Sequence, residues 1–352
     1  MKKRILLIYP PSPVLNREDR CQQPTKDLIV IPPLPPTDLM YLAAVAEKAG
    51  LEAKINDYSQ NGDYEADLKE FNPDYLVVNI ATPTLEHDLD AVKKAKEICP
   101  NVVTIAKGAA FLTLADRIIK EHNELDFGIL GEAENTLKEI LEEKPKAEIL
   151  GLYYKENDEV KFTGNRPFIE DLDSLPFPAR HLVDNNIYRR PDNNKVQATI
   201  KVSRGCPFHC FFCLATPVSG AKVRRRSPEN IVAEIKECVE KYNIKNFLFW
   251  SDIFNIDKDW TMKLCQAIID SGLKITWSAN TRADTADLEM AEMMYKSGCR
   301  LVSIGVESGS QYMLEKMGKK ITLNDVRRTV KVFKKAKIRI YNYFVIGLPW
   351  ET

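Results

Sequence analysis

Three cysteines lie within eight consecutive residues, in the segment Ser203-Arg-Gly-Cys-Pro-Phe-His-Cys-Phe-Phe-Cys213. Thiolates are soft ligands that suit iron–sulfur clusters and zinc. Three thiolates from one short loop can bind three irons of a cubane cluster and leave the fourth iron open to another ligand. We therefore take Cys206, Cys210 and Cys213 as candidate metal ligands.

Zinc is the main alternative for this loop. Structural zinc usually takes four ligands, often as two pairs of cysteines. His209 offers a fourth ligand, but it lies inside the same loop, and no second cysteine pair follows. A cluster used only for electron transfer is a further alternative. The three thiolates favour an iron–sulfur cluster whose open iron chelates S-adenosylmethionine, so that an electron from the cluster can cleave the sulfonium to a 5′-deoxyadenosyl radical.

The rest of the composition is that of an ordinary globular protein. Hydrophobic residues make up 44% and charged residues 28%, and 50 basic residues balance 50 acidic ones, so nothing points to a nucleic-acid partner. No apolar run reaches the roughly 18–20 residues that span a bilayer, and the apolar start is too short for a secretion signal. We therefore expect a cytoplasmic protein without an integral membrane segment or disulfides. The other five cysteines are interpreted as buried small hydrophobic residues: Cys21, Cys99, Cys238, Cys265 and Cys299.

The N-terminal part alternates apolar strands with amphipathic helices. Strands are predicted at 3–9, 53–57, 75–80, 102–106 and 126–130, and helices at about 37–49, 63–71, 86–98, 111–122 and 134–142. This alternation favours a parallel sheet covered on both faces. We predict an α/β domain of flavodoxin-like or Rossmann-like type over residues 1–145, with ligands beyond the carboxyl ends of its strands.

Residues 146–195 are predicted to be a linker that contains a hairpin, 149–154 with 160–163, and a proline-rich stretch. A second series follows, with strands at 198–203, 246–250, 274–278, 300–305 and 338–346, and helices at 228–241, 258–270, 285–297 and 322–336. Ser227 followed by Pro228 marks the start of the first of these helices. The spacing predicts a partial β/α barrel over 196–352, with its chemistry at the carboxyl ends of the strands. The basic run 222–226 is interpreted as a solvated loop, with contact to an anionic substrate as the alternative.

The three-cysteine loop, with the aromatic Phe212 before its last cysteine, resembles the signature of the radical S-adenosylmethionine (radical SAM) superfamily. The wider pattern resembles the class with an N-terminal cobalamin-binding domain, which includes cobalamin-dependent methyltransferases and the anaerobic magnesium-protoporphyrin monomethyl ester cyclase group. The matching segments are Leu175-Pro-Phe-Pro-Ala-Arg180, Arg226-Ser-Pro-Glu-Asn230, Trp250-Ser-Asp-Ile-Phe254, Trp277-Ser-Ala-Asn-Thr-Arg282, Ile304-Gly-Val-Glu-Ser308 and Ile346-Gly-Leu-Pro-Trp-Glu-Thr352.

The resemblance implies a set of residues around S-adenosylmethionine. Phe212 belongs to the cysteine loop, and Asp252 after the second strand stands where the family contacts the amino group. Asn280 or Arg282, expected after the third strand, would meet polar parts of the cofactor, and Glu307 would hold the ribose hydroxyls. The alternatives are that Asp252 caps the next helix and that Arg282 forms a surface ion pair.

The resemblance also implies cobalamin in the first domain, near Thr82, Gly108, Gly131 and Glu132. None of the four histidines stands in the Asp-x-His-x-x-Gly motif that supplies a cobalt ligand: His87, His122, His181 and His209. Radical SAM members often bind cobalamin without such a ligand. In the loop 107–111, however, Ala110 replaces the polar ring that the family commonly shows, so an empty Rossmann-like domain is the alternative.

The function that the resemblance implies is abstraction of a hydrogen from a small-molecule substrate, followed by methyl transfer from cobalamin. The alternatives are radical cyclisation or rearrangement, and a non-enzymatic iron–sulfur protein. A reductase such as flavodoxin or ferredoxin is the expected partner, and sensitivity to oxygen is expected. The family's partial barrel normally has six β/α units, whereas five strands and four helices are predicted here. We therefore expect a fragment or truncated reading frame, with an exposed edge at the fifth strand.

Overall fold

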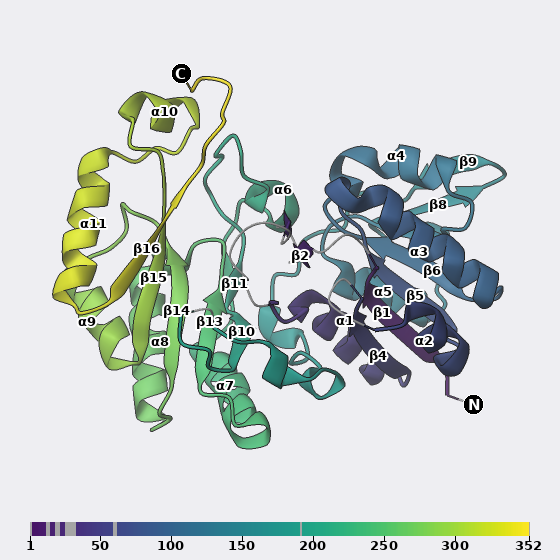
Figure 1. The fold of residues 1–352 in the computed structure, drawn as a ribbon, viewed down its shortest axis with the longest axis horizontal. Helices are drawn as coiled ribbons and strands as arrows, with labels where there is room; N and C mark the ends of the chain where they lie inside the picture. The colour runs from purple at the N-terminus through teal and green to yellow at the C-terminus, as the bar shows by residue number, and fades with distance from the viewer. Residues whose placement is uncertain are drawn as a thin grey trace. The chain divides into compact units, whose positions relative to one another are not determined.

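The computed structural model (Figure 1) describes residues 2–11, 15–17, 22–24, 33–58, 62–190 and 192–351. Cys21 lies outside them. The chain forms two compact units, one of Met1–Ile169 with Leu175–Asp192 and the other of Glu170–Ser174 with Asn193–Thr352. No helix in the described part of the chain is both long and apolar enough to cross a membrane.

The sheet of the first unit has the strand order β4-β1-β5-β6-β7-β8-β9. Its strands are β1 (Arg4–Tyr9), β4 (Glu52–Asp57), β5 (Tyr75–Asn79), β6 (Val103–Lys107), β7 (Phe127–Ile129), β8 (Leu152–Glu156) and β9 (Glu159–Phe162). The first five are parallel and confirm the predicted strands within one residue at each end. Because β4 pairs on one side of β1 and β5 on the other, the strand order reverses between β1 and β5. This is the flavodoxin-like order, in which ligands bind at that switch point.

Helices cover both faces of the first sheet, as its alternating side chains require. They are α1 (Thr37–Lys48), α2 (Tyr64–Phe71), α3 (Leu85–Ile98), α4 (Phe111–Glu121) and α5 (Ala133–Leu141). Along β1, Ile5 and Leu7 pack into one core with α1 and α5, while Leu6 and Ile8 pack into the other with α2, α3 and α4. A strand buried on both faces has to be apolar throughout, which explains the unbroken run at the start of the sequence. A separate pair of short strands, β2 (Leu15–Arg17) and β3 (Gln22–Pro24), is antiparallel.

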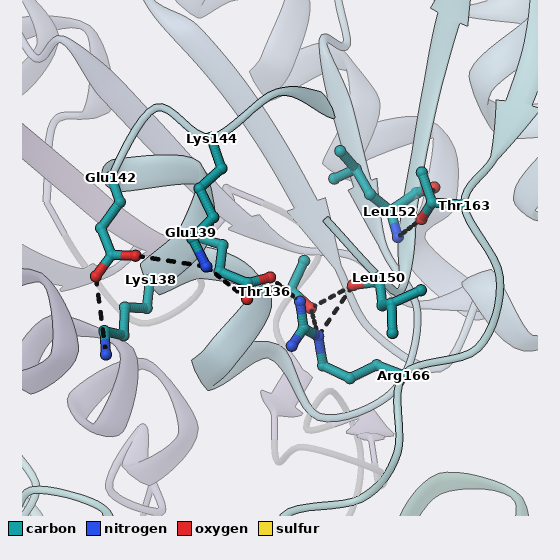
Figure 2. Close-up of polar contacts among 9 residues, drawn as sticks. All are labelled: Thr136, Lys138, Glu139, Glu142, Lys144, Leu150, Leu152, Thr163 and Arg166. Atoms are coloured by element: carbon teal, nitrogen blue, oxygen red, sulfur yellow. Dashed lines mark hydrogen bonds and ion pairs between the residues drawn. The ribbon is translucent and has the colours of Figure 1, made fainter. Parts of the chain in front are cut away.

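The predicted hairpin forms, and β8 also pairs with β7, so that the hairpin extends the first sheet. The chain after it is fastened to α5 by Arg166 (Figure 2). Arg166 Nε donates to Thr136 Oγ1 at 2.8 Å and to the Leu150 carbonyl at 3.0 Å, and its terminal nitrogen pairs with Glu139. Residues 164–169, within the predicted linker, therefore belong to the first unit.

The second unit contains five parallel strands in chain order: β10 (Gln197–Lys201), β13 (Asn246–Trp250), β14 (Thr276–Thr281), β15 (Cys299–Glu307) and β16 (Arg339–Phe344). The longer helices between them are α7 (Pro228–Tyr242), α8 (Lys258–Asp270), α9 (Leu288–Lys296) and α11 (Leu323–Lys335), all packed in one core with the sheet, and the short α6 (Ala215–Ser219) follows the cysteine loop. Ser227 caps α7 as predicted, accepting a hydrogen bond from Asn230 N. Consecutive parallel strands joined by helices make the predicted partial β/α barrel.

Two of the differences between this unit and its predicted elements bear on the site. A helix that the sequence analysis missed, α10 (Gln311–Lys316), follows β15; its signal was Ser310, which caps it, and Gly318 beyond its end. Strand β14 begins and ends later than predicted, so Asn280 lies within the strand and not after it. Position 280 is opposite Ser303 of β15.

Candidate functional site

The cysteine loop follows β10 at the carboxyl edge of the second sheet. It begins after β11 (Ser203–Arg204), which pairs antiparallel with β12 (Arg224–Arg225). Gly205 starts the loop with φ +102°, and a Cβ there would lie 2.1 Å from the Lys222 carbonyl oxygen. Only glycine allows this backbone conformation and this close approach. The backbone turn at Gly205 therefore directs the chain from β11 into the cysteine loop.

Hydrogen bonds from two consecutive backbone N–H groups hold the start of the loop. Asp252, after β13, accepts the Gly205 N–H at 2.7 Å, and Cys206 N donates to the Gly220 carbonyl at 3.0 Å. Asp252 does not cap the next helix, because Asp257 caps α8 by accepting from Trp260 N at 3.0 Å. The alternative structural role considered for Asp252 was therefore wrong, and its carboxylate is held beside the cysteine loop.

The three thiols differ in exposure but share one loop. Cys206 and Cys210 are half-buried, and Cys213 is exposed. Burial raises the pKa of the Cys206 thiol, and it raises that of Cys210 against the lowering effect of the positive charges of Lys319 and Arg282. Among the residues described, no group of three or more His, Cys, Asp or Glu side chains converges as a site for a single metal ion. Cysteines that each bind a different iron of a cubane do not need to converge on one point.

A methyl group at the start of the loop should disrupt it. In a Gly205→Ala variant the Cβ collides with the Lys222 carbonyl, at a φ of +102° that alanine rarely adopts. We expect a loss of roughly 1–3 kcal/mol in stability and a several-fold fall in iron bound after anaerobic reconstitution. Gly309→Ala is the control, because a Cβ there meets nothing within 4 Å. Equal iron contents in the two variants would contradict this role of Gly205.

The remaining residues implied for S-adenosylmethionine lie at the same edge of the sheet or beside it. Phe212 is half-buried in the cysteine loop, and Asn280 is half-buried near the end of β14. Glu307, the last residue of β15, is buried at φ +69°, and its Oε1 lies 2.7 Å from Lys319 Nζ. A Cβ on Gly305 would approach that carboxylate oxygen to 2.4 Å, so the glycine makes room for the ion pair.

Arg282 is not the surface ion pair considered as its alternative. It is buried, and its guanidinium carbon lies 3.7 Å from the centre of the Phe208 ring in the cysteine loop. Its terminal nitrogen donates to the carbonyl oxygens of Lys319 and Lys320, the latter at 3.1 Å. The Arg282 side chain therefore contacts the cysteine loop and residues 319–320 of the second unit.

The basic run 222–226 is not a solvated loop throughout, contrary to the prediction. Arg224 is buried and donates to the Ser219 carbonyl at 2.7 Å, and Arg226 is buried in an ion pair with Glu234 of α7. Only Lys222 is fully exposed among the basic residues of the run. Because β12 passes beside β11, these arginines point into the unit and fix the strand pair that carries the cysteine loop.

A buried polar cluster that the sequence analysis missed lies at the switch point of the first sheet. Asp38, in the first turn of α1, accepts from Tyr9 at the end of β1 (2.5 Å), from Asn79 at the end of β5 (3.0 Å) and from Lys107 at the end of β6 (2.6 Å). We call Tyr9, Asp38, Asn79 and Lys107 the Asp38 cluster. Its only local signal was Asp38 in the first turn of a predicted helix, since its partners are up to 69 residues away.

Two of the residues predicted to contact cobalamin, Thr82 and Gly108, follow β5 and β6. Thr82 is exposed after β5, in a turn fixed by Asp88, which accepts from Ala81 N and Thr84 Oγ1. Gly108 has φ +139°, and a Cβ there would lie 2.0 Å from the Ile80 carbonyl oxygen, so the ends of β5 and β6 meet tightly at this glycine.

The other two predicted residues follow β7. Gly131 is exposed at φ +87°, and a Cβ there would meet nothing within 4 Å. Glu132 Oε2 accepts from Ile169 N at 2.7 Å, so this side chain holds the chain that follows the hairpin. The backbone at Gly131 is therefore open to a ligand, whereas the Glu132 side chain is bonded to the backbone of Ile169.

Sequence comparisons place the chain in a family. The radical SAM superfamily matches residues 200–352, and the B12 binding domain matches residues 32–141. An uncharacterized methyltransferase of Pyrococcus horikoshii is 30% identical, over 93% of this chain and 75% of that protein. This chain belongs to the radical SAM superfamily. The cysteine loop falls within the first matched region, and Asp38, Asn79 and Lys107 of the Asp38 cluster fall within the second.

Other relatives of the chain differ from one another in activity. The cytidylyl-2-hydroxyethylphosphonate methyltransferase of Streptomyces wedmorensis is 27% identical over 98% of this chain and 73% of that protein. The anaerobic magnesium-protoporphyrin IX monomethyl ester cyclase of Cereibacter sphaeroides is 26% identical over 90% of this chain, which spans only 54% of the cyclase.

Solved structures confirm the predicted fold of this radical SAM chain. The radical S-adenosylmethionine methyltransferase TsrM of Kitasatospora setae, solved with cobalamin and a [4Fe-4S] cluster, superposes with a TM-score of 0.79 at 18% identity. The match covers all of this chain and 71% of TsrM. OxsB, a cobalamin-dependent S-adenosylmethionine radical enzyme, gives a TM-score of 0.80 at 17% identity, covering 98% of this chain and 49% of OxsB.

Proposed function

We propose that this radical SAM enzyme holds a 4Fe–4S cluster with Cys206, Cys210 and Cys213 and cleaves S-adenosylmethionine reductively. The observation that carries the proposal is the loop of three thiols at the carboxyl edge of the second sheet, with Asp252 holding its first backbone turn. The loop fits a cubane because it offers three thiolates, and a fourth iron would stay open. Asp252 is the proposed contact for the amino group and Glu307 for the ribose hydroxyls. Phe212 and Asn280 complete the proposed cofactor contacts.

We further propose that the first unit binds cobalamin at the switch point between β1 and β5. Three features along the carboxyl edge from β5 to β7 fit a large flat ligand: the open backbone of Gly131, the exposed Thr82, and the tight turn at Gly108, where only glycine fits. The Asp38 cluster lies beneath, joining α1 to the ends of β1, β5 and β6. Its part is to hold these strand ends rigidly below the ligand.

The reaction that these sites support best is methyl transfer to a small-molecule substrate. The bound groups would supply a reducing electron, a hydrogen-abstracting radical and a methyl group, the hard chemistry being theirs. The protein holds the cluster loop by Gly205 and Asp252, and it orients S-adenosylmethionine along the strand ends. The methyltransferase relatives support this reaction.

The deciding experiment is anaerobic reconstitution with iron, sulfide and cobalamin, followed by reduction in the presence of S-adenosylmethionine. Methyl transfer from cobalamin predicts 5′-deoxyadenosine and S-adenosylhomocysteine together, because cobalamin must be remethylated. Formation of 5′-deoxyadenosine alone would favour the cyclisation or rearrangement supported by the cyclase relatives. A reducible cluster that never cleaves S-adenosylmethionine would leave an electron-transfer protein and would contradict the proposal.

A reductase such as flavodoxin or ferredoxin and a cytoplasmic location complete the proposal. The cluster needs a one-electron donor, and three partly exposed thiolates with an iron–sulfur cluster suit a reducing compartment. Pull-down of the reconstituted protein with reduced flavodoxin, compared with the cluster-free protein, tests the first of these.

A further inference from the structure

Arg282 connects three segments that are distant in the sequence. Its guanidinium lies over Phe208, between the first and second cysteines of the loop. Its terminal nitrogen donates to the carbonyl oxygens of Lys319 and Lys320, in the segment between α10 and α11. Its own backbone N–H donates to Asn255 Oδ1 at 3.1 Å, in the segment between β13 and α8. One residue at the end of β14 thus touches the cysteine loop and both neighbouring segments.

Internal contacts occupy one face and one terminal nitrogen of the guanidinium. Besides the two carbonyls, the Asp284 carboxylate lies 2.7 Å from Nε and supplies a counter-charge. One face of the plane is covered by Phe208 at 3.7 Å, and the residue is 5% exposed. Arginine suits such a place because its planar group can stack on a ring and donate in its own plane at the same time.

A second contact joins the same two segments. Phe211 N donates to the Met317 carbonyl at 2.9 Å, directly between the cysteine loop and the end of α10. On the other side of the loop, Thr216 Oγ1 donates to the carbonyls of Cys206 (3.1 Å) and Phe208 (2.9 Å). The backbone around Phe208 is therefore fixed by Thr216, and its ring is fixed by Arg282.

We propose that Arg282 is a positioning residue that locks the cysteine loop onto the 317–320 segment, and that it is not a ligand of S-adenosylmethionine. The inference rests on the proposed function only in assigning the cysteine loop to the binding of an iron–sulfur cluster. The lock itself is made entirely by residues of this chain.

Hydrogen exchange of the full chain, purified without its cluster, tests the lock. In Arg282→Met the stack and both carbonyl bonds are lost, so amides of 206–213 and 317–320 should exchange about tenfold faster or more. Arg282→Lys keeps the charge but not the planar group, and we expect an intermediate increase. Phe208→Leu should also increase the exchange rate of the amides of residues 206–213. If the methionine variant does not fold, the exchange of the lysine variant is compared with that of the wild type instead.

Arg300→Met is the matched control. Arg300 lies over the Tyr295 ring at 4.3 Å and donates to the carbonyls of Tyr295 and Cys299, the same kinds of contact at the start of β15, on the amino edge of the same sheet. Its loss should leave exchange in 206–213 unchanged.

A second measurement separates positioning from cofactor binding. On reconstituted protein, Arg282→Lys should lower the iron content and speed cluster loss to a chelator, while chains that keep a cluster bind S-adenosylmethionine with wild-type affinity. Unchanged exchange in 206–213 with a tenfold weaker affinity for S-adenosylmethionine would make Arg282 a cofactor ligand and overturn the inference. Failure of the wild-type protein to cleave S-adenosylmethionine would instead affect the proposed function, because the exchange result does not depend on it.

Discussion

Anaerobic reconstitution of a Cys210→Ala variant should give a protein that binds little or no iron, where the wild type binds about four irons per chain. Each loop cysteine would hold a different iron, so the loss of one leaves a second iron without a protein ligand. Cys210 is half-buried and feels the charges of Lys319, Arg282 and Glu307, and the described cysteines outside the loop are all buried elsewhere in the chain. Iron and sulfide analysis, with the visible absorption of the cluster, measures the effect.

Cys265→Ala is the control for this prediction. Cys265 is buried in the core of the same unit, where burial raises its pKa to about 12, so its thiol stays neutral. Its removal should leave the iron content unchanged, at a stability cost of about 1 kcal/mol for the small cavity. If Cys210→Ala keeps the wild-type iron content and spectrum, the cluster assignment is wrong. Tight zinc without iron in the wild type would restore the zinc interpretation.

The second large effect is expected in the first unit. In an Asp38→Asn variant the buried Lys107 ammonium loses the carboxylate that lies 2.6 Å away, and Tyr9 and Asn79 lose a charged acceptor. Removing one partner of a buried ion pair typically costs roughly 3–5 kcal/mol. Because a chain of two units does not unfold in one transition, the effect is best measured by hydrogen exchange of the β1, β5 and β6 amides.

Two further variants make this prediction specific. Combining Asp38→Asn with Lys107→Met removes the buried cation as well and should recover part of the lost stability. Glu121→Gln, which breaks the exposed pair with Arg117, should leave the exchange of the β1, β5 and β6 amides unchanged, because solvent screens that pair. The Asp38 variant should also retain less cobalamin after desalting, since the strand ends below the proposed ligand are loosened. Wild-type exchange in β1, β5 and β6 of the Asp38 variant would show that the cluster does not stabilise the sheet.

Local patterns in the sequence were sufficient for much of this protein. The cysteine loop could be recognised because its three thiols are only a few residues apart, so the covalent chain already keeps them together. The strands and helices of the first sheet were predictable because apolar runs and 3.6-residue periodicity are local properties. The start of α7 was predictable for the same reason, since Ser227 caps an amide only three residues later.

Other features depended on which strands lie side by side. Asn280 was expected in a loop and lies within β14, because the strand is extended by pairing with β15, which a single segment does not reveal. The run 222–226 looked solvated because it is basic, yet Arg226 is buried by Glu234 and Arg224 by the Ser219 carbonyl. Charge alone led to the prediction that these arginines are exposed, whereas an ion pair and a hydrogen bond hold them in the interior.

The sequence by itself determined the chemistry of this protein, because the ligands of the proposed cluster are neighbours along the chain. Only the tertiary structure decided what holds that chemistry in place. Asp38 meets Lys107 because β1 and β6 flank β5 in one sheet, and Arg282 meets Phe208 and Lys319 because consecutive parallel strands bring their carboxyl ends to one edge. Such partners are tens of residues apart, and their contact is set by strand order and register, which no local pattern of residues encodes.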